Sequence, residues 1–141
     1  MKRVILDTNI ILRIADRTAP EHELSYSIVK RLAIEGYELC IIPQVLIEFW
    51  VVATRPVNSN GFGWDASYTM TELEKLQSLF LLLPDNESIF IHWKNLVLSG
   101  VYGKRAHDAR IAAAAFAHNA DAIATLNVQD FTSFGVNLIS S

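Results

Sequence analysis

The sequence has little cysteine, no long apolar run and no excess of positive charge. A single cysteine, Cys40, occurs among 141 residues, which excludes an intramolecular disulfide framework and a thiolate metal site. Cys40 lies in the apolar run 39–42, which indicates a buried thiol in a reducing compartment. A chain of this length can stabilise its core by burial alone, so the sequence predicts a single domain over residues 1–141.

The absence of a long apolar run also argues against a membrane protein or an exported protein. No apolar stretch approaches the roughly 20 residues that cross a bilayer, and Asp7 interrupts the first apolar residues too early for a signal peptide. We therefore expect a cytoplasmic protein with no membrane partner. The formal net charge of -3 argues against binding nucleic acid through bulk electrostatics, but it is compatible with a local basic patch.

Strand-like and helix-like segments alternate along the chain. Short apolar runs bounded by turn residues predict strands at residues 4–6, 39–42, 80–83, 121–125 and 136–139. Helical spacing of apolar residues predicts helices at residues 10–14, 21–35, 44–54, 65–79 or 67–79, 88–98 and 106–118. This alternation indicates an α/β fold, a three-layer α/β/α sandwich with a mostly parallel central sheet. The helix at 44–54 is apolar almost all round, so we expect it to be buried.

Four acidic residues stand where apolar structure would not favour a charge. They are Asp7, Glu48, Asp108 and Asp130. Glu48 is the sharpest case, because apolar residues flank it on both sides in the helix at 44–54. A buried, unpaired carboxylate costs several kcal/mol. A hard divalent cation, which prefers oxygen ligands, would neutralise several such groups at once.

The predicted topology brings these acids toward one edge of the sheet. Asp7 and Asp130 follow predicted strands, while Glu48 and Asp108 lie early in helices. In an open α/β sheet such positions face one crevice outside the carboxyl ends of the strands. Carboxylates around Mg²⁺ or Mn²⁺ would leave positions for water and a phosphate oxygen, which predicts metal-assisted hydrolysis of a phosphodiester.

Four short motifs follow one another along almost the whole chain. They are Asp7-Thr8-Asn9, Glu48 after Pro43-Gln44, His107-Asp108-Ala109 and the segment 125–131. Together they resemble the signatures of PIN-domain ribonucleases, with the VapC-type toxins as the closest branch. The resemblance implies an endoribonuclease that depends on Mg²⁺ or Mn²⁺ and cleaves RNA. It also implies a homodimer and a small cognate antitoxin protein that occupies the active-site groove.

The resemblance also assigns roles to individual acids. It implies that the metal ligands are Asp7, Glu48 and Asp108. The last motif has Asn127 where many family members carry Asp. Either Asp130 supplies the fourth catalytic acid, or Asn127 contacts the metal through water. Asp130 taken alone is also typical of a structural turn residue.

Polar residues beside the acids are candidates for supporting roles. The resemblance implies that Thr8 orients a carboxylate or a water molecule, and it includes Asn9, Thr125 and Asn127 in the same motifs. The first explanation for Thr8, Asn9 and Thr125 is local, because such side chains satisfy backbone groups at turns and helix starts whether or not a metal is near.

Three basic residues near Asp108 are candidates for phosphate binding. They are Lys104, Arg105 and Arg110. Basic side chains can position a phosphate without reading bases, so they would not determine sequence preference. The competing explanation is ordinary solvated charge.

Each principal acid also has a purely structural explanation. Asp7 could cap the helix that follows it, and Asp108 could complement the dipole at a helix start. Glu48 could form an ion pair with Arg13 or Arg55. Metal binding explains the acids together, whereas these explanations apply to one residue at a time.

Two other functions compete with the nuclease. In a phosphatase of the haloacid dehalogenase type, Asp7 would attack phosphorus and form an aspartyl-phosphate. That chemistry generally has a second Asp two residues later, where this chain has Asn9. The other alternative is a noncatalytic PIN-like scaffold acting through protein contacts, which the replacement at Asn127 leaves open.

Overall fold

A five-stranded sheet in the order β3-β2-β1-β4-β5 forms the centre of the protein, in a computed structural model that describes residues 1–140. The strands are β1 (Arg3–Leu6), β2 (Glu38–Ile41), β3 (Leu81–Leu82), β4 (Ala122–Ala124) and β5 (Leu138–Ile139). Each pair of neighbouring strands is parallel. The predicted α/β architecture with a parallel central sheet is therefore confirmed.

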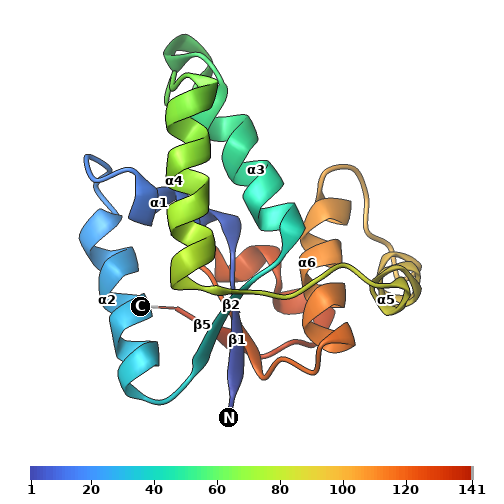
Figure 1. The fold of residues 1–141 in the computed structure, drawn as a ribbon. Helices are drawn as coiled ribbons and strands as arrows, with labels where there is room; N and C mark the ends of the chain where they lie inside the picture. Colours follow the sequence, from blue (N-terminus) through green and yellow to red (C-terminus); the bar gives the residue numbers. More distant parts are fainter. Residues whose placement is uncertain (141) are drawn as a thin grey trace.

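Helices cover both faces of this sheet (Figure 1). They are α1 (Thr8–Ala15), α2 (His22–Ile34), α3 (Pro43–Thr54), α4 (Ala66–Leu79), α5 (Glu87–Val97) and α6 (Arg105–Ala117). Figure 1 shows α1, α2 and α4 on one side of the sheet and α5 and α6 on the other. The packing agrees, because α1 contacts α2 and α3, α3 contacts α4, and α5 contacts α6. The result is the predicted three-layer sandwich.

After its first residue, Arg3, the central strand β1 is apolar, as is all of β4, because both faces of these strands are covered. Val4, Ile5 and Leu6 of β1 and Ile123 of β4 have no exposed surface. Such continuous burial is typical of parallel strands between two helical layers. Cys40 of β2 is also fully buried and is a free thiol, which confirms the burial predicted from its apolar neighbours.

Helix α3 is less buried than its sequence predicts. Val45 and Phe49 are fully buried, but Ile47 is 63% exposed and Val51 is 52% exposed. The expectation that the whole helix is buried is wrong. The reason is its position, since α3 and α4 project together beyond the edge of the sheet (Figure 1). One apolar strip of α3 is consequently left in solvent.

The structure corrects one predicted boundary, that of β3, and decides between the two predicted starts of α4. The strand predicted at 80–83 is only Leu81–Leu82, although Phe80 and Leu83 are buried beside it; apolar burial thus continues where strand pairing stops. The α4 helix begins after Asp65, whose carboxylate accepts a hydrogen bond from the backbone amide of Tyr68. This capping bond selects residue 65 over residue 67.

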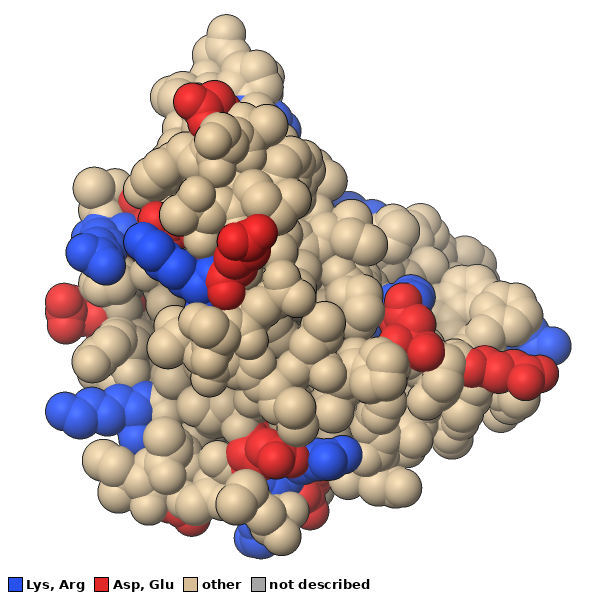
Figure 2. Space-filling model, viewed as in Figure 1, with Lys and Arg blue, Asp and Glu red and all other residues tan. Residues whose placement is uncertain are grey.

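The surface carries charge in small, separate groups. Figure 2 shows basic and acidic side chains scattered over one face, with no continuous positive area in that view. This distribution agrees with the net charge of -3. Among residues 1–140, none of the helices combines the length and the apolar character that crossing a bilayer requires.

Candidate active site

The carboxyl ends of β1 and β4 lie side by side and begin the site. The two strands pair in parallel with Leu6 opposite Ala124, so the residues that follow them, Asp7 and Thr125, become neighbours. The backbone amide of Asp7 donates to the carbonyl of Ala124 over 2.9 Å. Strand pairing thus places Asp7 at the edge of the sheet formed by the carboxyl ends of the strands.

Both carboxylate oxygens of Asp7 are held by hydrogen bonds. Oδ1 accepts from the backbone amide of Thr8 at 2.7 Å, and Oδ2 accepts from the Thr125 hydroxyl at 2.8 Å. The Thr8 bond makes Asp7 the N-cap of α1, so the capping explanation and a metal role apply to the same residue. Asp7 is only 6% exposed. Burial raises its pKa from 3.8 to about 6, with contributions from the charges of Asp108 and Glu48.

Glu48 lies on the first half of α3 and is held by two neighbouring side chains. The Thr8 hydroxyl donates to Oε1 at 2.6 Å, and the Gln44 amide donates to Oε2 at 3.2 Å. Thr8, for which the resemblance implies a supporting role, therefore contacts a carboxylate of the site. The alternative ion pairs do not form within residues 1–140, because Arg13 pairs with Glu21 and the Arg55 guanidinium donates to a backbone carbonyl.

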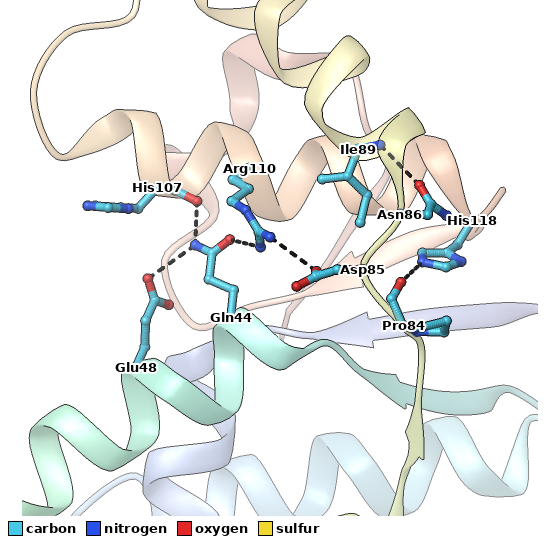
Figure 3. Close-up of polar contacts among 9 residues, drawn as sticks. All are labelled: Gln44, Glu48, Pro84, Asp85, Asn86, Ile89, His107, Arg110 and His118. Carbon is cyan, nitrogen blue, oxygen red and sulfur yellow. Dashed lines mark hydrogen bonds and ion pairs between the residues drawn. The ribbon is translucent and has the colours of Figure 1, made fainter.

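Gln44 is a site residue that the sequence reasoning missed. Its amide nitrogen also donates to the carbonyl of His107 at 2.8 Å, and its amide oxygen accepts from Arg110 at 3.0 Å (Figure 3). The side chain is buried, at 8% exposure. The available signal was a lone glutamine in an apolar helix, one turn before Glu48, at the spacing that places two side chains on one face.

Asp108 and Asp130 are the two remaining acids of the site. Asp108 is half-buried in the first turn of α6. Its pKa is raised from 3.8 to about 6, mainly by burial and in smaller part by the charges of Asp130 and Glu48. Asp130 is exposed in a short 3-10 helix, Val128–Asp130. It lines an open hollow of about 540 Å³ together with Asn127.

Asn9, Thr125 and Asn127 connect the ends of β1 and β4. The fully buried Thr125 hydroxyl accepts from the Asn9 amide at 3.3 Å and from the backbone amide of Asn127 at 3.0 Å. The Asn9 carbonyl oxygen accepts from the backbone amide of Leu126 at 3.2 Å. These contacts are of the local, backbone-satisfying kind expected for such residues. They also fix the support of Asp7.

The three predicted phosphate contacts have different surroundings. Lys104 is exposed just before α6. Arg105 donates to the Ser133 hydroxyl at 3.0 Å and lies over the Phe134 ring. Arg110 is engaged by side chains of the protein itself, as described above for Gln44, so Lys104 is the basic side chain best placed to meet a ligand.

The acids present a donor set that suits a hard divalent cation. All four offer carboxylate oxygens, which are the ligands that Mg²⁺ and Mn²⁺ prefer, and the charges of Glu48 and Asp108 act on buried Asp7. Within the described chain, no group of three or more acidic, histidine or cysteine side chains is arranged to hold a metal ion directly. Mg²⁺ commonly keeps several waters and uses only one or two carboxylates. The residues therefore fit a largely hydrated ion.

Known proteins share this sequence and this fold. The PIN domain matches residues 4–134. "Ribonuclease VapC24" of Mycobacterium tuberculosis is 26% identical over 95% of this chain and 92% of its own length. VapBC2 of Rickettsia felis, solved with a promoter DNA fragment, has a TM-score of 0.73 at 19% identity, covering 97% of both chains.

A second solved structure gives the same result. DNA-bound VapBC of Salmonella typhimurium has a TM-score of 0.72 at 20% identity, covering 99% of this chain and 98% of that one. At such identities the two solved structures show the shared fold. The match to the PIN domain extends from β1 through the 3-10 helix after Asp130 and so includes every acid of the site. The chain belongs to the PIN-domain family.

Proposed function

We propose that the protein is a divalent-metal-dependent endoribonuclease and the toxin of a toxin–antitoxin module. One observation carries the proposal: hydrogen bonds bring Asp7, Glu48 and Asp108 together, because Thr8 beside Asp7 donates to Glu48, and Gln44 links Glu48 to the carbonyl of His107 beside Asp108. Clustered acids of this kind are typical of metal-assisted phosphodiester hydrolysis. The similarity to Ribonuclease VapC24 supports RNA as the substrate.

In this proposal Asp7, Glu48 and Asp108 would hold a hydrated Mg²⁺ or Mn²⁺ ion, in part through its water molecules, and the ion would supply an activated water and neutralise charge on the phosphate. The protein's own contribution is orientation. Thr125 and the Thr8 amide fix both oxygens of Asp7. The Thr8 hydroxyl turns Glu48 toward the same edge. These carboxylates are consequently held in place before a substrate arrives.

The substrate would lie over the open side of the site. Asp130 and Asn127 line a hollow formed by residues 126–130, and Asp130 is linked to the site because its charge raises the pKa of Asp108. We propose Asp130 as the fourth catalytic acid and Asn127 as a supporting residue. Lys104 and Arg105 would contact the phosphate backbone of the RNA, which positions the strand without selecting a base.

The surroundings of Asn9 disfavour the phosphatase alternative. A phosphatase of the haloacid dehalogenase type would need a second carboxylate at that position, but the amide of Asn9 is occupied by Thr125 and Leu126. The noncatalytic scaffold makes a different prediction, because it needs no metal. Calorimetric titration with Mn²⁺ separates it from the nuclease: a protein that binds no Mn²⁺ would be a scaffold.

The solved structures similar to this chain also support a protein partner. Both are described as VapBC assemblies, and VapC-type toxins act in pairs with an antitoxin. We propose a small cognate antitoxin as partner and a homodimer as the form of the protein itself. Co-expression with the proposed antitoxin should abolish RNA cleavage by the purified complex, and cleavage that is unchanged in that complex would contradict the pairing.

The decisive experiment is metal-dependent cleavage of a mixed RNA pool, with the cut sites sequenced. We expect cleavage with Mg²⁺ or Mn²⁺, none in excess EDTA, and none from Asp7→Asn or Glu48→Gln proteins purified in the same way. Circular dichroism of each variant should match the wild type, because both substitutions keep side-chain size. Cleavage that survives EDTA, or that Asp7→Asn retains, would contradict the metal mechanism.

A further inference from the structure

Two acids of the site lie on helices from opposite sides of the sheet. Glu48 belongs to α3, whereas Asp108 belongs to α6, which packs with α5 on the other face (Figure 1). Contacts between α3 and α6 therefore contribute to the separation of the two acids. Gln44 makes that connection, since its amide donates to Glu48 and to the carbonyl of His107, the residue directly before Asp108.

The orientation of the Gln44 amide follows from its partners. The nitrogen faces two acceptors, the Glu48 carboxylate and the His107 carbonyl, while the oxygen faces the Arg110 guanidinium. Rotating the amide by 180° would place oxygen against both acceptors and nitrogen against a cation. Only the observed orientation satisfies all three contacts. Arg110 therefore keeps the donor of Gln44 pointed at Glu48.

Arg110 is in turn held by the loop between β3 and α5. Its Nη2 lies 3.1 Å from Oδ1 of Asp85. The loop is fixed to its surroundings on either side, because the Pro84 carbonyl lies 2.8 Å from His118 Nε2 and Asn86 caps α5 (Figure 3). Hydrogen bonds thus anchor the loop on both sides of Asp85, where the chain of contacts ends.

We propose that Gln44, Arg110 and Asp85 form a positioning relay that sets Glu48 relative to Asp108. The proposal rests on the proposed function of these acids, and it assigns Arg110 a role different from phosphate binding. The relay contacts neither substrate nor phosphate. It acts through Glu48, and the partners that orient metal ligands typically contribute 10–100-fold to metal affinity or activity.

A double-mutant cycle on Gln44 and Arg110 tests the relay. We expect Gln44→Met and Arg110→Met each to lower kcat for RNA about 10–100-fold, with KM within about twofold of the wild type. Because Arg110 acts through Gln44, the double variant should be no worse than Gln44→Met alone. Losses that multiply would mean that the two residues act independently, which would overturn the relay.

A second measurement separates the relay from a phosphate contact. RNA affinity is measured in EDTA over a range of salt concentrations for the wild type, Arg110→Met and the charge-matched control Arg31→Met, which removes an arginine of α2 that pairs with Glu35. A positioning residue leaves the salt dependence equal to that of the control. A salt slope that falls by about one for Arg110→Met alone would identify a phosphate contact and overturn the proposal.

Mn²⁺ affinity, measured by calorimetry for the same variants, gives a readout that does not depend on RNA cleavage. We expect Mn²⁺ affinity to fall about 10-fold or more in Gln44→Met and Arg110→Met, and by less in Asp85→Asn, whose carboxylate is half-exposed and whose replacement keeps the fold. Unchanged affinity in folded variants would overturn the relay. Failure of the wild type to cleave any RNA would instead contradict the proposed function, so the two claims fail separately.

Discussion

Asp7 combines a structural role with the proposed chemical one. As the N-cap of α1 it needs an oxygen acceptor, which an asparagine would also provide. Its second oxygen is buried against the Thr125 hydroxyl, and burial raises its pKa to about 6. A neutral side chain would satisfy the cap without that electrostatic cost. Capping alone therefore does not account for a carboxylate at this position, whereas the proposed metal role does.

Asp108 allows this electrostatic cost to be measured. Its pKa is about 6 in the folded protein and 3.8 as the ordinary value, so between these pH values the folded state binds more protons than the unfolded state. Stability therefore falls as pH rises through this window. We expect Asp108→Asn to raise the melting temperature of the metal-free protein at pH 7.5 and to flatten its change between pH 4 and 6.5. A lower melting temperature at pH 7.5 would contradict this.

Thr125 is the residue on which the junction of β1 and β4 depends. Its buried hydroxyl serves Asp7, Asn9 and the amide of Asn127. Thr125→Val keeps the shape but leaves these groups without a partner, so we expect the free energy of unfolding in urea to fall by about 1–3 kcal/mol. Thr125→Ser keeps the hydroxyl and should cost about 1 kcal/mol. Equal losses would mean that packing, not hydrogen bonding, determines the effect.

The order of the elements could be predicted because each one carries its own signal. The run from Val4 to Leu6 is apolar on both faces, and α2 shows helical spacing followed by Gly36, which has a positive φ of 91°. Parallel pairing then brings the ends of β1 and β4 together, and with them Asp7 and Thr125. This part of the site follows from local patterns combined with topology.

The junction of α3 and α6 could not be predicted in the same way. Gln44 meets His107 and Arg110 from 63 and 66 residues away, and no local period encodes such contacts. The sequence interpretation selected acids by residue type, so it assigned Arg110 to phosphate and gave Gln44 no role. The exposure of Ile47 was missed for a related reason: apolar composition does not show that a helix projects past its sheet.

The connection from α3 to α4 depends on close packing of backbone. The carbonyl of Arg55 lies where a Cβ at Gly61 would be, and the next residues return to α3, since Phe62 and Trp64 donate to the carbonyls of Val52 and Ala53. Gly61→Ala must shift this backbone, at a cost of about 1–3 kcal/mol. We expect a lower urea midpoint and a changed near-ultraviolet signal from Trp64. An unchanged urea midpoint would contradict this prediction, because it would show that the backbone between α3 and α4 can shift at little cost in stability.

At the scale of the whole molecule, the unusual feature is the apolar strip of α3. Ile47 and Val51 are more than half exposed beside Leu46, Trp50 and Leu73, with which they line a shallow apolar hollow. Contiguous exposed apolar surface of this kind typically marks a protein interface. The same strip continues to Gln44 and Glu48 along a second hollow, so a protein that covers it would also border the active site.

We expect this strip to be the contact of the homodimer that the family resemblance implies. A two-fold contact uses the same patch twice, so one charged substitution introduces two charges into the interface. Ile47→Lys should therefore convert a dimer into a monomer in light scattering, whereas Ile34→Lys, at a site 77% exposed at the end of α2, should leave the mass unchanged. A monomeric wild type would contradict the dimer. A dimer that persists in Ile47→Lys would place its contact elsewhere and leave the α3 strip to the antitoxin.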